Sequence, residues 1–336
     1  LLIAVNQLKA QVVINEFSGA NATVIADEKG DYPDWIELYN QGSTSVNLLK
    51  YALSDDPILP CKWRFPNVLI APNSHLVIMA DGASKTKLVN HWETAIKSND
   101  SWSYHLPTAA SDTNWRNLSF SDISWSKGKG GLGYGDGDDS TIISTSRTVY
   151  LRKKVTISDT AQLVNALLHI DYDDGFVAYL NGVEIARANL GSVGDRPAYD
   201  EFANSEHEAV MYQGGRPDSF LIENSVLRKL VLPGTNVLAI EVHNASSIST
   251  DLSAIPFLSF GVTRSNYVFP APPAWFRNSL KDYLHCNFKL SKTGETIVLS
   301  DSNAIIIDQK YTYGKSKVQD YAIIELDRVT ERKPLQ

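Results

Sequence analysis

The sequence is poor in cysteine, has no long apolar run and carries no excess of positive charge. Its two cysteines, Cys61 and Cys286, are too few for a disulfide scaffold or a tetrahedral cysteine metal site. No apolar run approaches the roughly 20 residues needed to span a bilayer, so we expect no membrane span. The net charge of -7 argues against nucleic acid as a partner, because phosphate binding needs clustered Lys and Arg.

Short strand-like runs are what the sequence does contain. The clearest stretch is LHIDYDDGFVAYLNGVEIAR at 168–187, which predicts two strands around a tight acidic turn, followed by a hairpin at Asn181-Gly182. Similar runs, each closed by Gly, Pro, Asn or Asp, fill most of the 336 residues. Strands at this density indicate all-β sandwiches and not an α/β fold, and the length suggests two or three domains.

Residues 1–11 differ from the rest of the chain. They are apolar at first and end in Ala10 and Gln11, just before the first convincing strand at Val12. This pattern is typical of the end of a secretory signal peptide. It predicts a secreted or cell-surface protein of the bacterial envelope, whereas the alternative is an amphipathic first strand or helix.

Five motifs in order carry a family resemblance: VVINEF, DEKGDYPDWIELYN, NLLKYALSDDP, KWRFP and HLVIMADG. They resemble the lamin-tail domain of exported bacterial proteins, an immunoglobulin-like β-sandwich. The family pattern normally continues with a segment similar to NFKLSKTGETIVLSD, which occurs here only at 287–301. We therefore predict a discontinuous lamin-tail domain of residues 12–98 and 283–336. The alternative is that 283–336 begins a second lamin-tail domain.

Residues 99–263 carry a second resemblance, through WRNLSF, GYGDGDD, YLRKKVTI, DYDDGFVAYLNGVEIAR and NVLAIEVHN. These motifs resemble galactose-binding-like jelly-roll domains of bacterial surface proteins and glycan-degrading enzymes. The proline-rich residues 264–282 read as a linker. Because such modules often precede a CotH-type kinase or other surface domains, further domains of the same polypeptide are expected partners.

The cysteines fall in different halves of the predicted lamin-tail domain. A disulfide between Cys61 and Cys286 is one expectation for an exported protein, and two independent thiols are the other.

Two acidic clusters are candidate functional sites. Asp136, Asp138 and Asp139 lie in a glycine-rich loop whose carboxylates suit a structural Ca²⁺ ion, although a solvated turn remains the alternative. Asp171 and Asp173 could form a glycosidase acid and base pair, but aspartates in such a turn more often accept local hydrogen bonds. We expect the second role and no catalysis.

Aromatic side chains are candidate sugar-stacking residues, because their rings combine an apolar face with a polar edge. One group is Trp115, Trp125 and Tyr134, near the start of the inserted domain. The other is Tyr199, His207 and Tyr212, in the long polar loop 191–219. The alternative for most of them is a place in the core.

The sequence therefore predicts a non-catalytic, exported surface module for cell adhesion or carbohydrate binding. Its expected partner is a glycan or cell-envelope polysaccharide, and no cofactor is required beyond a structural Ca²⁺ ion. The alternatives are an accessory N-terminal region of a larger enzyme, glycan-active or CotH-type kinase, and a structural spacer without a ligand.

Overall fold

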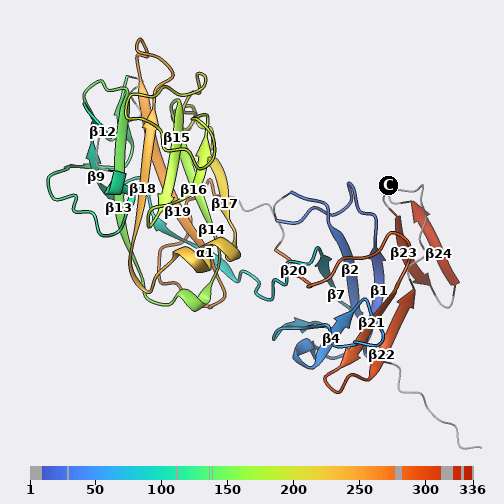
Figure 1. Cartoon of the computed structure of the whole chain (residues 1–336). Helices are drawn as coiled ribbons and strands as arrows, with labels where there is room; N and C mark the ends of the chain where they lie inside the picture. Colours follow the sequence, from blue (N-terminus) through green and yellow to red (C-terminus); the bar gives the residue numbers. More distant parts are fainter. Residues whose placement is uncertain are drawn as a thin grey trace, which may run out of the picture. The chain divides into compact units, whose positions relative to one another are not determined.

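The computed structural model describes residues 10–28, 30–110, 113–135, 137, 139–276, 282–311, 321–326 and 329–334. These residues divide into two compact units, one from 1–88 together with 278–336 and the other from 89–277 (Figure 1). Both units consist of strands, which confirms the predicted all-β class. Among the described helices, none is long and apolar enough to cross a membrane.

The first unit is an immunoglobulin-like sandwich of two four-stranded sheets. One sheet has the order β1 (Val12–Ser18), β2 (Asp34–Asn40), β7 (His75–Ala80) and β20 (Leu284–His285). The other has the order β22 (Ile306–Tyr311), β21 (Thr296–Asp301), β4 (Tyr51–Ser54) and β5 (Trp63–Arg64). Two short pairs complete the unit: β3 (Val46–Asn47) with β6 (Leu69–Ile70), and β23 (Tyr321–Leu326) with β24 (Val329–Pro334).

Strands from both ends of the chain share these sheets. β21 pairs with β4, so that Leu299 lies opposite Leu53, and β20 runs parallel to β7. In Figure 1 the orange strand β21 accordingly accompanies the blue strand β4. Leu53 and Leu299 are both fully buried in one core, which therefore needs apolar residues from both segments.

The second unit is a jelly-roll sandwich of two larger sheets. One has the order β10 (Ser126–Lys129), β9 (Ser101–His105), β13 (Thr148–Ile157), β18 (Gly234–His243), β15 (Gly175–Leu180) and β16 (Val183–Ala188). The other has the order β12 (Thr141–Ile142), β11 (Leu132–Tyr134), β19 (Leu252–Val262), β14 (Leu163–Tyr172) and β17 (Asp218–Ile222), with β8 (His91–Ile96) also paired to β19. Outside these sheets, the described part of the second unit has α1 (Asn224–Leu230) and the 3-10 turns η2 (Thr113–Arg116), η3 (Thr160–Gln162) and η4 (Met211–Gln213), whereas η1 (Leu48–Lys50) lies in the first unit.

The boundaries of the second unit differ from those predicted. Strand β8 pairs with β19, so residues 91–96 belong to this unit and not to the lamin-tail segment. The proline-rich segment is also attached to it, because the Glu93 carboxylate accepts backbone hydrogen bonds from Val268 and Phe269. The second unit therefore begins at Val89 and includes residues 264–276 of the predicted linker.

Residues 168–187 contain one hairpin, whereas the sequence predicted two tight turns: an acidic turn first and the Asn181-Gly182 turn after it. β15 and β16 form the predicted hairpin, and Asn181 and Gly182 have φ angles of 53° and 90°, as this turn requires. β14 and β15, however, lie in different sheets. The expected tight turn at Asp173 and Asp174 is wrong, because these residues carry the chain from one sheet to the other.

Candidate functional site

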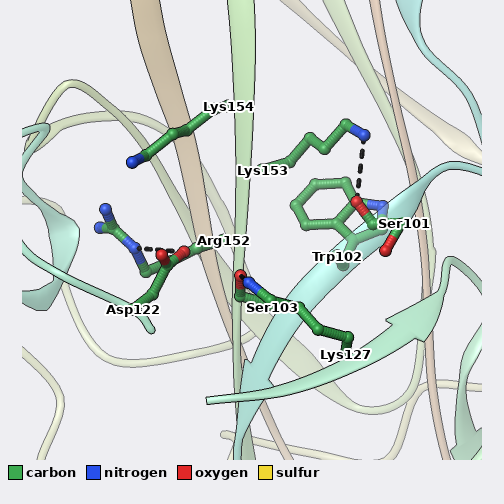
Figure 2. A pocket seen from close by; sticks show the side chains of 8 residues that line it. All are labelled: Ser101, Trp102, Ser103, Asp122, Lys127, Arg152, Lys153 and Lys154. Atoms are coloured by element: carbon green, nitrogen blue, oxygen red, sulfur yellow. Dashed lines mark hydrogen bonds and ion pairs between the residues drawn. The ribbon is translucent and has the colours of Figure 1, made fainter. Parts of the chain in front are cut away.

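A basic groove lies in the second unit where β9 and β13 stop pairing. Their ladder starts at Tyr150 opposite His105 and ends at Arg152 opposite Ser103. Next to this end is a cavity of about 350 Å³ (Figure 2). The residues that line it, which we call the basic groove, are Ser101, Trp102, Ser103, Asp122, Lys127, Arg152, Lys153 and Lys154.

Positive charge dominates the basic groove. Its lining has four cationic side chains and one carboxylate, although the whole chain has a net charge of -7. The amino groups of Lys127 and Lys153 donate to Ser103 Oγ and to the Ser101 carbonyl, which fixes their positions. Figure 2 shows no such interaction between Lys154 and the other lining residues. Lys154 is therefore the lining cation with the most freedom to meet a ligand.

Arg152 forms the floor of the basic groove and has a structural role. Its side chain is fully buried and donates to the carbonyls of Asn117 and Phe120 as well as to Asp122. Burial lowers the pKa of Arg152, whereas the Asp122 charge acts in the opposite direction. Burial also tends to raise the pKa of Asp122, but the Ser103 hydrogen bond and the neighbouring cations hold it below its usual value. The pair thus remains charged and anchors the loop before β10.

The first group of predicted stacking residues is largely internal. Trp115 is 1% exposed and Tyr134 is 8% exposed, so neither offers an open face to a sugar. Trp115 stacks on Tyr150 with 4.4 Å between ring centroids, because the loop that carries it folds over the outer face of the sheet. Trp125 is half-buried and stacks on His105. The alternative expectation, a place in the core, therefore describes this group better than sugar stacking.

The second group does not form one aromatic surface. Tyr199 packs against the cluster that contains Trp115, and the His207 ring stacks on Tyr172 with 4.1 Å between centroids. Tyr212 is the most open of the predicted stacking residues, with 45% of its surface exposed. The structure thus leaves Tyr212 as the member that a ligand could reach directly.

The aspartates around the sheet crossing bind backbone groups. Asp171 accepts hydrogen bonds from the N–H groups of Val210 and Met211. Asp174 accepts hydrogen bonds from those of His207 and Ala245. Of the two aspartates considered as an acid and base pair, Asp171 accepts hydrogen bonds as expected, although from a distant loop and not in a local turn. The other, Asp173, has an Oδ2 atom without a hydrogen-bond partner among the described residues.

The predicted calcium loop can be followed only in part. Asp136 and Asp138 lie outside the described residues. Asp139 is half-buried beside Gly133, where an added Cβ would lie 2.4 Å from its Oδ1 atom. The close approach explains why glycine stands at this position of β11. Calcium binding at Asp136, Asp138 and Asp139 stays a prediction.

The expected disulfide is not formed. Cys61 and Cys286 are both free thiols, and Sγ of Cys61 lies 3.6 Å from the hydroxyl of Ser300. Sγ of Cys286 points to the Phe288 carbonyl at 3.4 Å, and burial raises the pKa of this thiol to about 12. The alternative of two independent thiols is the correct one in this structure.

Sequence reasoning missed a buried charge network on the outer face of the β13–β18–β15 sheet. Glu241 is completely buried and accepts hydrogen bonds from Arg116 at 3.0 Å and from the Tyr179 hydroxyl at 2.6 Å. Burial tends to raise the pKa of Glu241, but the His243 hydrogen bond and the Arg116 charge outweigh it and lower the pKa. The sequence does contain a signal for this network, because the alternation in NVLAIEVHN places Glu241 and His243 on the face of the strand opposite to the core.

Comparisons with known proteins give little beyond the fold. No curated protein matches the chain. A β-glucuronidase from an uncultured Clostridium species has a TM-score of 0.34 and 10% identity, covering 74% of this chain and 45% of its own. A β-glycosidase from Bacteroides vulgatus has a TM-score of 0.32 and 13% identity, covering 72% of this chain and 33% of its own. This chain thus spans less than half of either enzyme, and likeness at these scores carries no functional argument.

The family comparison concerns the first part of the chain. A model of the Lamin Tail Domain family matches residues 6–169. The match takes in the first segment of the first unit and continues into the second unit. It includes β1 to β7 but not β20 to β22, which complete the two four-stranded sheets of the first unit. Residues 6–169, just under half of the chain, are therefore similar to the Lamin Tail Domain family, and the first unit has an immunoglobulin-like fold.

Proposed function

We propose that this chain is a non-catalytic module of a larger exported protein and that it binds acidic carbohydrate in the basic groove. The observation that carries the proposal is the convergence of Lys127, Arg152, Lys153 and Lys154 on one cavity of an acidic chain. Such a module would attach its protein to an acidic polysaccharide of a cell envelope.

The chemistry of the lining supports this ligand class. Lysine ammonium groups bind carboxylate and sulfate groups through charge-assisted hydrogen bonds. The hydroxyls of Ser101 and Ser103 can exchange hydrogen bonds with sugar hydroxyls. A neutral glycan would leave the charge of Lys154 without a counterpart, so we assign uronate-containing or sulfated glycans to the groove. The resemblance of the second unit to galactose-binding-like domains favours carbohydrate over other anions.

The proposal assigns no catalysis to the chain. Its support is the occupation of Asp171, one of the two carboxylates that the sequence offered as an acid and base, by the N–H groups of Val210 and Met211. The ionised Glu241 is likewise enclosed by Arg116 and Tyr179.

The test compares polygalacturonate with neutral dextran by isothermal titration calorimetry on the full chain. Lys154→Gln should weaken polygalacturonate binding at least about tenfold, because one charge-assisted hydrogen bond contributes roughly 1.5–3 kcal/mol. Binding should also weaken as salt rises, since added ions screen the exposed charges.

The matched control is Lys229→Gln, an exposed lysine on α1 of the same unit. It makes the same change in net charge and should leave the affinity unchanged. Equal losses of affinity in the two variants would show that only the net charge of the chain matters, and would overturn the assignment of binding to the basic groove. Absence of polygalacturonate binding would overturn the proposal itself and leave the second unit as a spacer or an accessory domain.

A further inference from the structure

Three carboxylates from separate segments meet in the second unit. Asp173 lies in the crossing between the two sheets, Glu208 in the loop before η4, and Asp251 directly before β19. One carboxylate oxygen from each lies within 4.8 Å of those from the other two. Like charges at this separation repel each other strongly unless a cation or a proton stands between them.

Asp173 differs from the aspartates on either side of it. It is 2% exposed, and its Oδ2 atom has no hydrogen-bond partner among the described residues. Asp171 and Asp174 are equally buried, but each accepts backbone hydrogen bonds. A buried carboxylate oxygen without a partner is costly and is rare in native proteins.

Neighbouring carboxylates surround Asp173 with negative charge. Burial raises its pKa first, and the neighbouring Asp174, Asp251 and Glu208 raise it further, to about 9. A bound cation would offset this negative charge and supply the partner that Oδ2 lacks.

We propose that Asp173, Glu208 and Asp251 bind a divalent cation, and that this cation is Ca²⁺. The donors are all carboxylate oxygens, which favours a hard ion over Zn²⁺ with its preference for nitrogen and sulfur. Three carboxylates can provide up to six oxygens, in the range that Ca²⁺ takes, and water can complete the shell. Mg²⁺ loses its own water reluctantly and should bind more weakly.

This site lies close to the loop in which the sequence placed calcium, but its ligands come from other segments. An added Cβ at Gly135 would lie 2.6 Å from Cβ of Asp251, so the chain after β11 passes directly over this residue. The ion would join the sheet crossing, the loop before η4 and the start of β19. Its role would be to fasten this end of the sandwich, independently of carbohydrate in the basic groove.

The experiment titrates CaCl₂ and then MgCl₂ into the chelator-treated full chain, without carbohydrate, by calorimetry and thermal unfolding. Ca²⁺ in about hundredfold excess over its Kd should raise the unfolding midpoint by about 5–10 °C. Asp173→Asn and Glu208→Gln should each remove this rise. Asp173→Asn should also melt no lower than the wild-type chain in chelator, because it removes charge repulsion and not a stabilising bond.

The matched control is Glu206→Gln, an exposed carboxylate of the same loop that stands outside the cluster. It should keep the full response to Ca²⁺. The proposal is overturned if the wild-type chain shows no Ca²⁺-dependent heat or shift, or if both cluster variants keep the response. Loss of the response in Glu206→Gln to the same extent as in Glu208→Gln would also overturn it. Because no glycan is present, these outcomes do not depend on whether the basic groove binds carbohydrate.

Discussion

His285 is a charged side chain inside the first unit. It is 1% exposed, and its ring nitrogens lie 2.8 Å from Asp81 Oδ2 and 3.1 Å from Glu28 Oε2. Burial lowers its pKa, but the hydrogen bonds and charges of these carboxylates outweigh burial and raise the pKa to about 9. Both nitrogens are occupied by carboxylates, so the imidazolium links distant segments of the first unit.

The pH dependence of stability should report this link. Because the pKa of His285 is raised from 6.5 in the unfolded chain, its contribution is complete below pH 6.5 and disappears as the pH rises through 9. The first unit should lose about 3 kcal/mol of unfolding free energy from this group between pH 6 and pH 10. Urea denaturation across this range measures the loss, and histidine NMR titration measures the pKa directly.

The control is His285→Gln, which removes the titrating group. Its stability should be lower at pH 6 and should vary less between pH 6 and pH 10. The contribution of Glu28 to stability depends on pH in the opposite direction, because the pKa of Glu28 is lowered to about 2. This contribution is present above pH 4.5 and is lost as the pH falls through 2. A histidine pKa near 6.5 in the folded chain would contradict this account.

At the scale of elements, the loop between β16 and β17 depends on the sheet crossing. Asp171 binds the N–H groups of Val210 and Met211, and Asp174 binds that of His207. Asp171→Ala should therefore release this loop, with a cost of about 1–3 kcal/mol for the unsatisfied N–H groups. Hydrogen exchange at residues 208–213 should become faster, and limited proteolysis should cut the loop earlier.

A similar acceptor elsewhere in the unit provides the comparison. Asp159 accepts a hydrogen bond from the N–H of Ala161 at the start of η3. Asp159→Ala should leave hydrogen exchange at residues 208–213 unchanged. If Asp171→Ala also left it unchanged, the loop would be held by other contacts and the anchoring role would be refuted.

The strands could be predicted from sequence, but the sheet that each strand joins could not. Alternation and the Asn181-Gly182 turn are local signals, and both described the β15–β16 hairpin correctly. The separation of β14 from β15 depends on pairing with β19 and β18, which lie far along the chain. No local signal distinguishes a crossing between sheets from a tight turn.

The candidate sites were harder to predict for a related reason. Trp115 has an indole ring with a polar N–H edge and was expected in a loop, which suggested a binding surface. The segment that carries it covers the outer face of a sheet, however, so the Trp115 side chain is buried. The lysines at 153 and 154 stood in a predicted strand, but the groove exists because the β9–β13 ladder ends beside them. Burial of this kind follows from long-range packing and not from residue type.

At the scale of the whole molecule, the chain leaves the first unit and returns to it at neighbouring points. Lys85 forms an ion pair with Asp282, and its carbonyl accepts a hydrogen bond from the N–H of His285. Removal of residues 89–277, replaced by a short Gly-Ser linker, should therefore leave a folded first unit. The shortened chain keeps only Trp35 and Trp63, both 3% exposed, so near-UV circular dichroism and fluorescence follow its unfolding.

The reciprocal truncation is the control. A chain that ends at residue 282 keeps β4 but lacks β20, β21 and β22, which complete both sheets of the first unit. Its first segment should show no cooperative unfolding and no near-UV signal from Trp35 or Trp63. Cooperative folding of this segment alone would show that it is an independent domain and would refute the shared core.

The interrupted first unit also sets an order of events during synthesis. At about 5–20 residues per second, a ribosome needs about 10–40 s to make residues 89–277. For that time β4 has emerged while its partner β21 does not yet exist, so its apolar edge is open to chaperones or to other nascent chains. The second unit is continuous in sequence and can fold during this interval. The second unit is thus completed first, and the first unit closes only after translation has passed β21.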